Sequence, residues 1–160
     1  MGNNPMRWLW AEIITALAII AAMITIYNWM ASNRIPDISG DWIIKVVIKK
    51  SSYLQYKDLE VEYSLYITSK NGRFVGEGVK IREGGSDIPF SQRTPIHIRG
   101  FVKGRQAIAT YILEGARRKS AGIFRWKISG HGSRLEGSFQ SEAADSSGLA
   151  LGYRVSNRQK

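Results

Sequence analysis

Hydrophobic and polar residues alternate along most of this chain with the period of two that is typical of β-strands. In the stretch DWIIKVVIKK, the even-numbered positions from 42 to 48 are hydrophobic and fall on one face. In LEVEYSLYITS, the odd-numbered positions from 61 to 67 do the same. The pattern predicts no helix after position 39 and eight strands, at residues 41–50, 59–69, 73–83, 94–102, 106–114, 121–129, 135–142 and 147–156.

Glycine-containing turns between these strands predict a meander. SKNGR holds an Asn-Gly pair, the strongest short signal for a β-hairpin, and VKGR and GHGSR are further tight turns. We therefore expect a mostly β fold, a small eight-stranded antiparallel barrel with a filled interior or room for one small ligand. An open two-sheet sandwich is the alternative. The regular hairpin spacing favours the barrel, which also leaves no exposed sheet edge.

A different pattern precedes the strands. Residues 8–30, WLWAEIITALAIIAAMITIYNWM, are hydrophobic almost throughout, and about 20 helical residues cross a hydrocarbon core of about 30 Å. Aromatic residues at both ends suit two membrane interfaces, and the bulky Trp29 before Ala31 argues against cleavage of a signal peptide. We therefore expect two domains, an N-terminal transmembrane anchor over 1–34 and a barrel over 35–160.

The charge of the chain points to anionic partners. Lysine and arginine number 23 against 13 acids, a formal net charge of +10. Leaving out Arg7, Arg34 and Glu12, the residues from 35 onward hold 21 basic and 12 acidic side chains, so about +9 falls on the barrel. Such a surface favours nucleotides, nucleic acid or acidic lipid head groups. The absence of cysteine excludes disulfides and thiol catalysis.

Motifs of enzyme catalysis are missing from the sequence. There is no G-x-S-x-G elbow, no G-x-x-x-x-G-K-[ST] loop and no H-E-x-x-H pair. GRFVGEGVK resembles a phosphate loop but lies in a predicted strand, where crowding inside a small barrel better explains Gly76 and Gly78. With His97 and His131 as the only histidines, a zinc site is not expected. We expect neither enzymatic activity nor a metal or cofactor.

Aromatic residues interleaved with basic residues on the strands favour nucleotide binding instead. Bases stack on aromatic rings, and phosphates pair with guanidinium or ammonium groups. Because neighbouring residues of a strand face opposite sides, Arg125 and Trp126 cannot both line one lumen without a bulge. The candidate ligand-binding residues are Tyr63, Arg99, Tyr111, Arg125, Trp126 and Tyr153.

The stretch IPDISGDWIIKVV carries a resemblance to a known fold. Gly40, Asp41 and Trp42 resemble the G-x-W signature in the first strand of lipocalin-like barrels. In that family the tryptophan closes the base of the barrel, and an arginine near the last strand packs over it. The resemblance implies this base-packing role for Trp42, with Arg154 or Arg158 as the arginine.

The arrangement of a membrane helix followed at once by a small basic barrel resembles the transmembrane β-barrel effectors of bacterial CBASS anti-phage systems, with relatives in Panoptes systems. The resemblance covers residues 8–30 and 39–156. It implies that the barrel binds a cyclic di- or trinucleotide and so controls oligomerisation of the membrane helix and membrane disruption. In some relatives the nucleotide instead holds the effector inactive.

One departure from that family is that its best-known members carry two membrane helices, whereas this chain offers one. The sensor hypothesis implies a single-pass protein of the inner membrane with a cytoplasmic barrel, assembled as a homo-oligomer, with no DNA or RNA polymer as partner. Two alternatives stay open. One is a membrane-tethered lipocalin-like protein that binds an apolar small molecule, and the other is a structural anchored barrel that binds another protein.

Overall fold

A computed structural model describes residues 17–27, 35–115 and 119–155 of the chain. The chain divides into two compact units, Met1–Arg34 and Ile35–Lys160. The second unit contains all the strands and the entire hydrophobic core, which runs in sequence from Ile38 to Ala150. In the described part of the chain, the ladders and the core of the barrel are thus built from the second unit alone, as expected of a unit that folds by itself.

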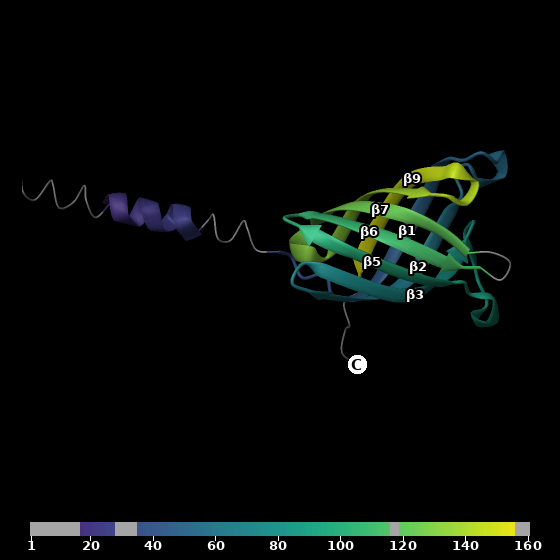
Figure 1. Cartoon of the computed structure of the whole chain (residues 1–160), viewed down its shortest axis with the longest axis horizontal. Coiled ribbons are helices and arrows are strands. Elements are labelled where there is room, and N and C mark those ends of the chain that lie inside the picture. Colours follow the sequence, from purple (N-terminus) through teal and green to yellow (C-terminus); the bar gives the residue numbers. More distant parts are fainter. Residues whose placement is uncertain (1–16, 28–34, 116–118, 156–160) are drawn as a thin grey trace, which may run out of the picture. The chain divides into compact units, whose positions relative to one another are not determined.

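The first unit contains a described helix at residues 17–27 (Figure 1). All of its residues are exposed, including the large apolar side chains of Leu17, Ile20 and Ile24. In the described part of the chain, no helix has both the length and the hydropathy that a membrane span requires. The other residues of the predicted span, 8–16 and 28–30, lie outside the described residues, so the transmembrane anchor stays a prediction.

The second unit is a closed antiparallel β-barrel, as the alternating pattern predicts. Each long strand pairs with its neighbour in the chain, and pairing of the first with the last, β1 with β9, closes the circle. The fold is thus a meander, and the alternative of an open sandwich is wrong. The strands are β1 (Gly40–Lys50), β2 (Glu60–Lys70), β3 (Arg73–Glu83), β5 (Pro95–Lys103), β6 (Gln106–Glu114), β7 (Lys119–Ser129), β8 (Arg134–Ser141) and β9 (Ser146–Arg154).

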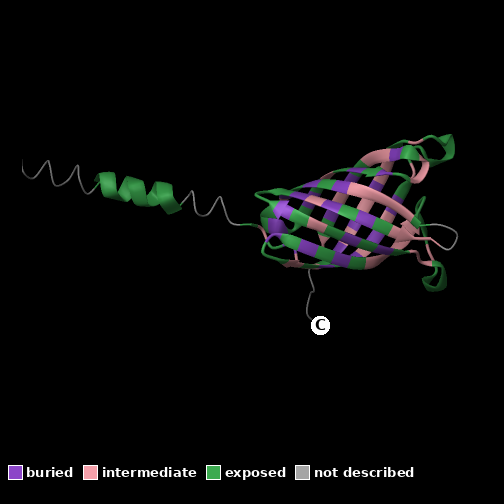
Figure 2. Ribbon diagram, in the orientation of Figure 1, coloured by how far each residue is buried: buried purple, intermediate pink, exposed green. Residues whose placement is uncertain are grey.

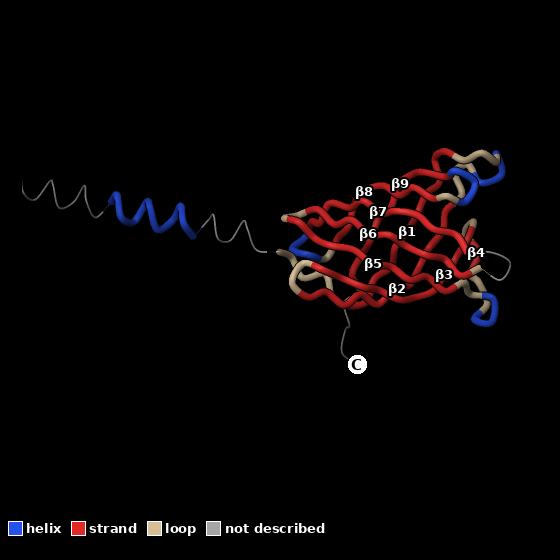
Figure 3. The backbone as a smooth tube through the Cα atoms, viewed as in Figure 1, coloured by secondary structure: helices blue, strands red, loops and turns tan. Residues whose placement is uncertain are grey.

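The connections differ between the two ends of the barrel (Figure 3). At one end, which we call the base, tight hairpins join the strands. Asn71 and Gly72, both with positive φ, turn β2 into β3 as the Asn-Gly pair predicts. The opposite end, which we call the mouth, carries the longer connections. They hold the two-residue strand β4 (Ser86–Asp87) and the 3-10 turns η1 (Leu54–Tyr56), η2 (Phe90–Gln92) and η4 (Ala143–Asp145); η3 (Gly130–Gly132) lies at the base.

Buried and exposed residues alternate along most of each long strand, and in β3 and β7 the alternation gives way to intermediate burial toward the mouth (Figure 2). The inward positions of β1 and β2 are the hydrophobic positions that the pattern predicts. Large and small side chains share the interior, because an eight-stranded barrel has little room. A Cβ on Gly122 would lie 2.4 Å from the Tyr111 hydroxyl, and one on Gly76 would lie 2.8 Å from Cγ1 of Ile98. The crowding expected at Gly76 is therefore present.

Candidate ligand-binding cavity

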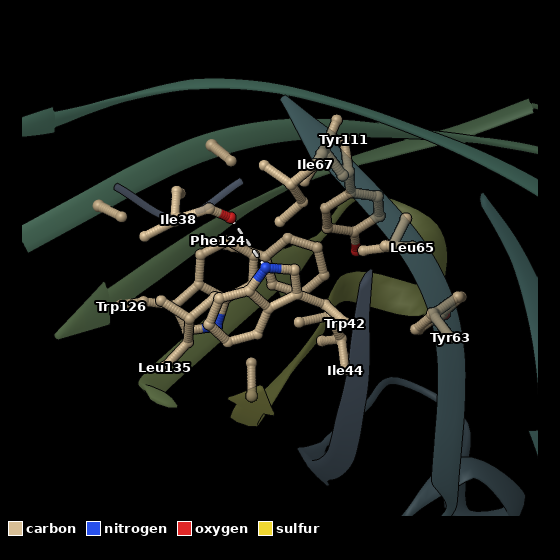
Figure 4. Packing of buried hydrophobic residues seen from close by; sticks show 14 of the residues in the cluster. Ile38, Trp42, Ile44, Tyr63, Leu65, Ile67, Tyr111, Phe124, Trp126 and Leu135 are labelled. Carbon is tan, nitrogen blue, oxygen red and sulfur yellow. Dashed lines mark hydrogen bonds between the residues drawn. The ribbon is translucent and has the colours of Figure 1, made fainter. Parts of the chain in front are cut away.

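The base of the barrel is closed by the segment that precedes β1. Asp37 accepts hydrogen bonds from the Ser39 amide at 2.9 Å and from the Ser39 hydroxyl at 2.6 Å. This tight turn places Ile38 inside the barrel, where its carbonyl accepts a 2.8 Å hydrogen bond from Trp42 Nε1 (Figure 4). Ile38 and Trp42 are fully buried. The lumen is therefore sealed at this end.

Arg154, at the end of β9, fastens the closure of the base. Its guanidinium carbon lies 5.8 Å from the centre of the Trp42 ring system. The same guanidinium donates hydrogen bonds to the backbone carbonyls of Ser39 and Asp37, the second at 3.3 Å. The structure thus puts an arginine of the last strand over the tryptophan of the first. Arg158, the other residue considered for this position, lies outside the described residues.

The mouth of the barrel leads into a cavity of about 200 Å³. Hydrophobic side chains form most of its wall, and Tyr63, Tyr111 and the hydroxyls of three serines add polar groups. The lining residues are contributed by β1, β2, β3, β6, β7, β8, β9 and the mouth turns, and they include Val46, Ile48, Leu59, Val61, Leu113, Ser120, Phe124, Phe139, Ser141 and Ser146. The cavity can therefore hold a flat or compact apolar group that carries a few hydrogen-bonding atoms.

The two cavity tyrosines stay neutral at physiological pH. Burial raises the pKa of the Tyr63 hydroxyl far above its ordinary value. Burial also raises the pKa of Tyr111, against a smaller opposing effect of hydrogen bonding with Ser141. Both hydroxyls therefore keep their protons and can donate to an acceptor atom on a ligand.

Two described cations near the cavity, Lys80 and Lys119, already have partners. Lys80 Nζ, which lines the cavity, lies 2.8 Å from Glu83 Oε2. Lys119, at the start of β7, lies 2.8 Å from a carboxylate oxygen of Glu114. A phosphate at the mouth would have to compete with these carboxylates for the ammonium groups. Because the contact would be electrostatic and solvent-exposed, it would weaken as salt concentration rises.

The six residues that the sequence nominates for ligand binding divide between the two faces of the barrel. Tyr63 and Tyr111 line the cavity. Trp126 is also buried, stacked on Phe124 at 4.5 Å between ring centres, and its indole N–H has no acceptor among the described residues. The other three, Arg99, Arg125 and Tyr153, are exposed on the outer face.

This division follows from strand alternation. Arg125 precedes the inward-facing Trp126, and Arg99 follows the inward-facing Ile98, so both arginines point outward. Tyr153 lies under the guanidinium of Arg134 at 5.4 Å from ring centre to Cζ. A ligand in the cavity would therefore contact none of these three side chains.

Sequence reasoning missed the serines and phenylalanines of the cavity. Phe139 and Ser141 are two residues apart on β8 and share its inner face, so the alternation contained the signal. Ser146 and Ser120 lie at the mouth ends of β9 and β7. Small polar residues at strand ends resemble turn residues in a sequence, and only the closed barrel places them around one cavity.

Comparison with known proteins does not assign the chain to a family. No protein-family model matches the chain, and no curated protein matches it in sequence.

Proposed function

We propose that this protein is a membrane-anchored sensor whose barrel receives one base of a cyclic di- or trinucleotide at its mouth. The observation that carries the proposal is the cavity itself, in which aromatic side chains and the hydroxyls of Tyr63 and Tyr111 surround a space open at the mouth. Bases bind proteins by stacking on aromatic rings and by hydrogen bonds to their edges. Neutral tyrosine hydroxyls supply donors for those edges.

The size of the cavity limits how much of the ligand enters. At about 200 Å³ it is below the roughly 300–1,000 Å³ of sites that enclose drug-sized molecules. A whole cyclic dinucleotide would not fit, so the ribose-phosphate ring and the second base would lie outside the mouth. Lys80 and Lys119 are then described cations that could meet a phosphate, provided that they leave Glu83 and Glu114.

The second part of the proposal is that the protein acts as a membrane-anchored effector. It is supported by the resemblance of the whole architecture and by the helix at residues 17–27. This helix has apolar side chains all around its circumference, and all of them are exposed. Such a helix needs a lipid or protein neighbour. Ligand binding would control association of the barrels, and through it oligomerisation of the membrane helices and membrane disruption at the bacterial inner membrane.

A thermal-shift screen of residues 35–160 against cyclic di- and trinucleotides tests the ligand. A compound that binds only the folded barrel raises its Tm once its concentration exceeds Kd. Tyr63→Phe and Tyr111→Phe should reduce the shift, because each removes one donor and keeps the ring. Tyr66→Phe is the matched control, since Tyr66 lies on the outer face of β2 with 58% of its surface exposed. A well-folded barrel that responds to no cyclic nucleotide would contradict the proposal.

The wall of the cavity favours one competing function, binding of an apolar small molecule. Val46, Ile48, Val61 and Leu113 all line it, and Lys80, the one basic residue among its described lining residues, is already paired. Mass spectrometry of the purified barrel distinguishes the two functions. A lipid or hydrophobic compound that co-purifies with the wild-type barrel, with affinity independent of salt, would favour the apolar ligand.

A further inference from the structure

The outer wall formed by β3, β5, β6 and β7 carries an unusual set of cations. In the register of these strands, Arg73, Phe101, Ile108 and Arg125 are direct neighbours in one row. The row toward the mouth contains Val75, Arg99, Thr110 and Ile123, and the row toward the base contains Lys103, Gln106 and Lys127. We call the eleven residues of these three rows the basic face.

The basic face contains five cations and no acid. All five are exposed, and none of them forms an ion pair with a described carboxylate. The wall made by β1 and β2 behaves differently. There Lys45 lies 2.6 Å from Glu60, and Lys49 lies 2.9 Å from Asp58. Two lysines of the β1–β2 wall are thus paired with described carboxylates, whereas none of the five cations of the basic face is.

Apolar side chains lie among the free cations. Phe101 is 49% exposed and Val75 is 51% exposed, and each lies beside an arginine of the neighbouring strand. Strands in a sheet are about 4.8 Å apart, so a row of four residues spans about 14 Å. Basic residues mixed with exposed apolar side chains over such an area fit an anionic bilayer, in which the cations meet head groups and the apolar groups enter the interface.

The basic face reaches the base of the barrel, which is the end at which the chain enters from the predicted membrane segment. This position suits docking on a membrane surface. Arg73 begins β3, Lys103 ends β5 and Gln106 begins β6, so these residues lie at the base. The chain enters the barrel at this end, through Ile35 and the turn that plugs the lumen. The mouth with its cavity opens at the opposite end.

We propose that the basic face docks the barrel on the surface of a membrane that contains anionic lipids. A single-stranded nucleic acid is the other polyanion to consider, but proteins bind it through a groove with several stacking aromatics. The basic face has Phe101 as its single aromatic residue, and it lies on the convex outer wall of a barrel. The proposal goes beyond the ligand function and does not depend on what occupies the cavity.

Vesicle co-sedimentation of residues 35–160 tests the docking. The barrel should bind phosphatidylcholine vesicles that contain phosphatidylglycerol, should not bind pure phosphatidylcholine vesicles, and should be released by salt. Each basic residue near an anionic surface strengthens binding by roughly fivefold. The variant R73Q/R99Q/R125Q should therefore bind at least about tenfold more weakly.

Two triple variants serve as controls. K49Q/K50Q/K57Q removes the same charge near the mouth and should bind almost as well as wild type, and R73K/R99K/R125K keeps the charge of the face and should also bind. Equal losses in the two glutamine variants, or no binding of wild type to anionic vesicles, would overturn the proposal. So would an oligonucleotide that binds more tightly than the vesicles and loses affinity in R73Q/R99Q/R125Q.

A second measurement does not depend on the folding of a triple variant. Phe101→Trp places an exposed indole on the basic face, and its emission should shift to shorter wavelength when anionic vesicles are added. Leu149→Trp is the matched control, because Leu149 is 48% exposed on β9, which lies across the barrel from β5 and β6 in the strand order, and its emission should stay unchanged. The reverse result, or equal shifts in both variants, would overturn the assignment of this face.

Discussion

The two buried tryptophans of the barrel differ in whether the indole N–H has a hydrogen-bond acceptor. Trp42 donates its indole hydrogen to the carbonyl of Ile38, whereas the indole nitrogen of Trp126 has no acceptor among the described residues. Both side chains are at least 97% buried. A buried carbonyl that loses its donor retains the full cost of its desolvation, so the two side chains are not equivalent for stability.

Replacing each tryptophan by phenylalanine measures this difference. Trp42→Phe should lower the free energy of unfolding by about 1–3 kcal/mol more than Trp126→Phe, because only the first leaves a carbonyl unpaired. Urea denaturation of residues 35–160 gives both values. Equal losses would show that packing alone, and not the bond to Ile38, sets the contribution of Trp42.

The turn beneath Trp42 makes the base sensitive to acid. Hydrogen bonds from Ser39, with a smaller effect of the nearby Arg154, lower the pKa of Asp37 below its ordinary value of 3.8. A lowered pKa means that the ionised carboxylate stabilises the folded state above about pH 4, and this stabilisation is lost as pH falls through the folded-state pKa. In Asp37→Asn, the free energy of unfolding should therefore fall less steeply below pH 4. Parallel pH profiles for wild type and variant would contradict the role of this turn.

At the scale of the strands, glycines decide how the interior is filled. Gly76 of β3 faces Ile98 of β5, and the missing Cβ makes room for the isoleucine. The same arrangement recurs at Gly122 of β7, which faces Tyr111 of β6. At these two positions a strand can carry a large inward side chain because the residue opposite it on the neighbouring strand is a glycine.

A double-mutant cycle tests this complementarity. Gly76→Ala should destabilise the barrel by about 1–3 kcal/mol through overpacking, and Ile98→Ala by about 2–5 kcal/mol through a cavity. The double variant should lose clearly less than the sum, because the added methyl group then occupies space that the isoleucine has left. Additive losses in urea denaturation would mean that the crowding at Gly76 comes from the backbone and not from Ile98.

At the scale of the whole molecule, the proposed function gives a role to the short stretch between the predicted membrane segment and the barrel. Residues 31–38, ASNRIPDI, join the predicted membrane segment to a barrel whose base is plugged by the end of that same stretch. Pro36 restricts the backbone here. If the barrels associate as proposed, a short and stiff connection would transmit this association to the helices, whereas a flexible linker would not.

Inserting a Gly/Ser stretch after Arg34 separates sensing from the membrane effect. The insertion lies outside the barrel, so the Tm shift caused by the ligand should match that of wild type. Membrane leakage, or toxicity to cells that express the full chain, should be lost. A helix of equal length inserted at the same place is the control, and it should preserve more of the effect. Unchanged toxicity with the flexible insertion would contradict the coupling.

The local pattern of the chain was enough to predict most of the fold. Alternation is a property of the extended backbone, so it revealed the eight long strands and the inward faces of β1 and β2. The Asn-Gly pair revealed a hairpin because few residues adopt positive φ so readily. The two-residue strand β4 was not predicted, since Ser86 and Asp87 carry no alternation.

What the sequence alone determined is therefore local: the strands, their turns, the side on which each residue lies relative to its neighbours, and the excess of basic residues. Only the tertiary structure decided which residues of different strands lie together in the cavity or on the outer wall. Closure of β1 on β9 brings Tyr63 and Tyr111 to one cavity, and the strand register gathers Arg73, Arg99 and Arg125 on the outer wall. These groupings depend on pairing between residues far apart in the chain. A pattern with a period of two fixes the two faces of each strand, and it does not say which residues of two distant strands pair.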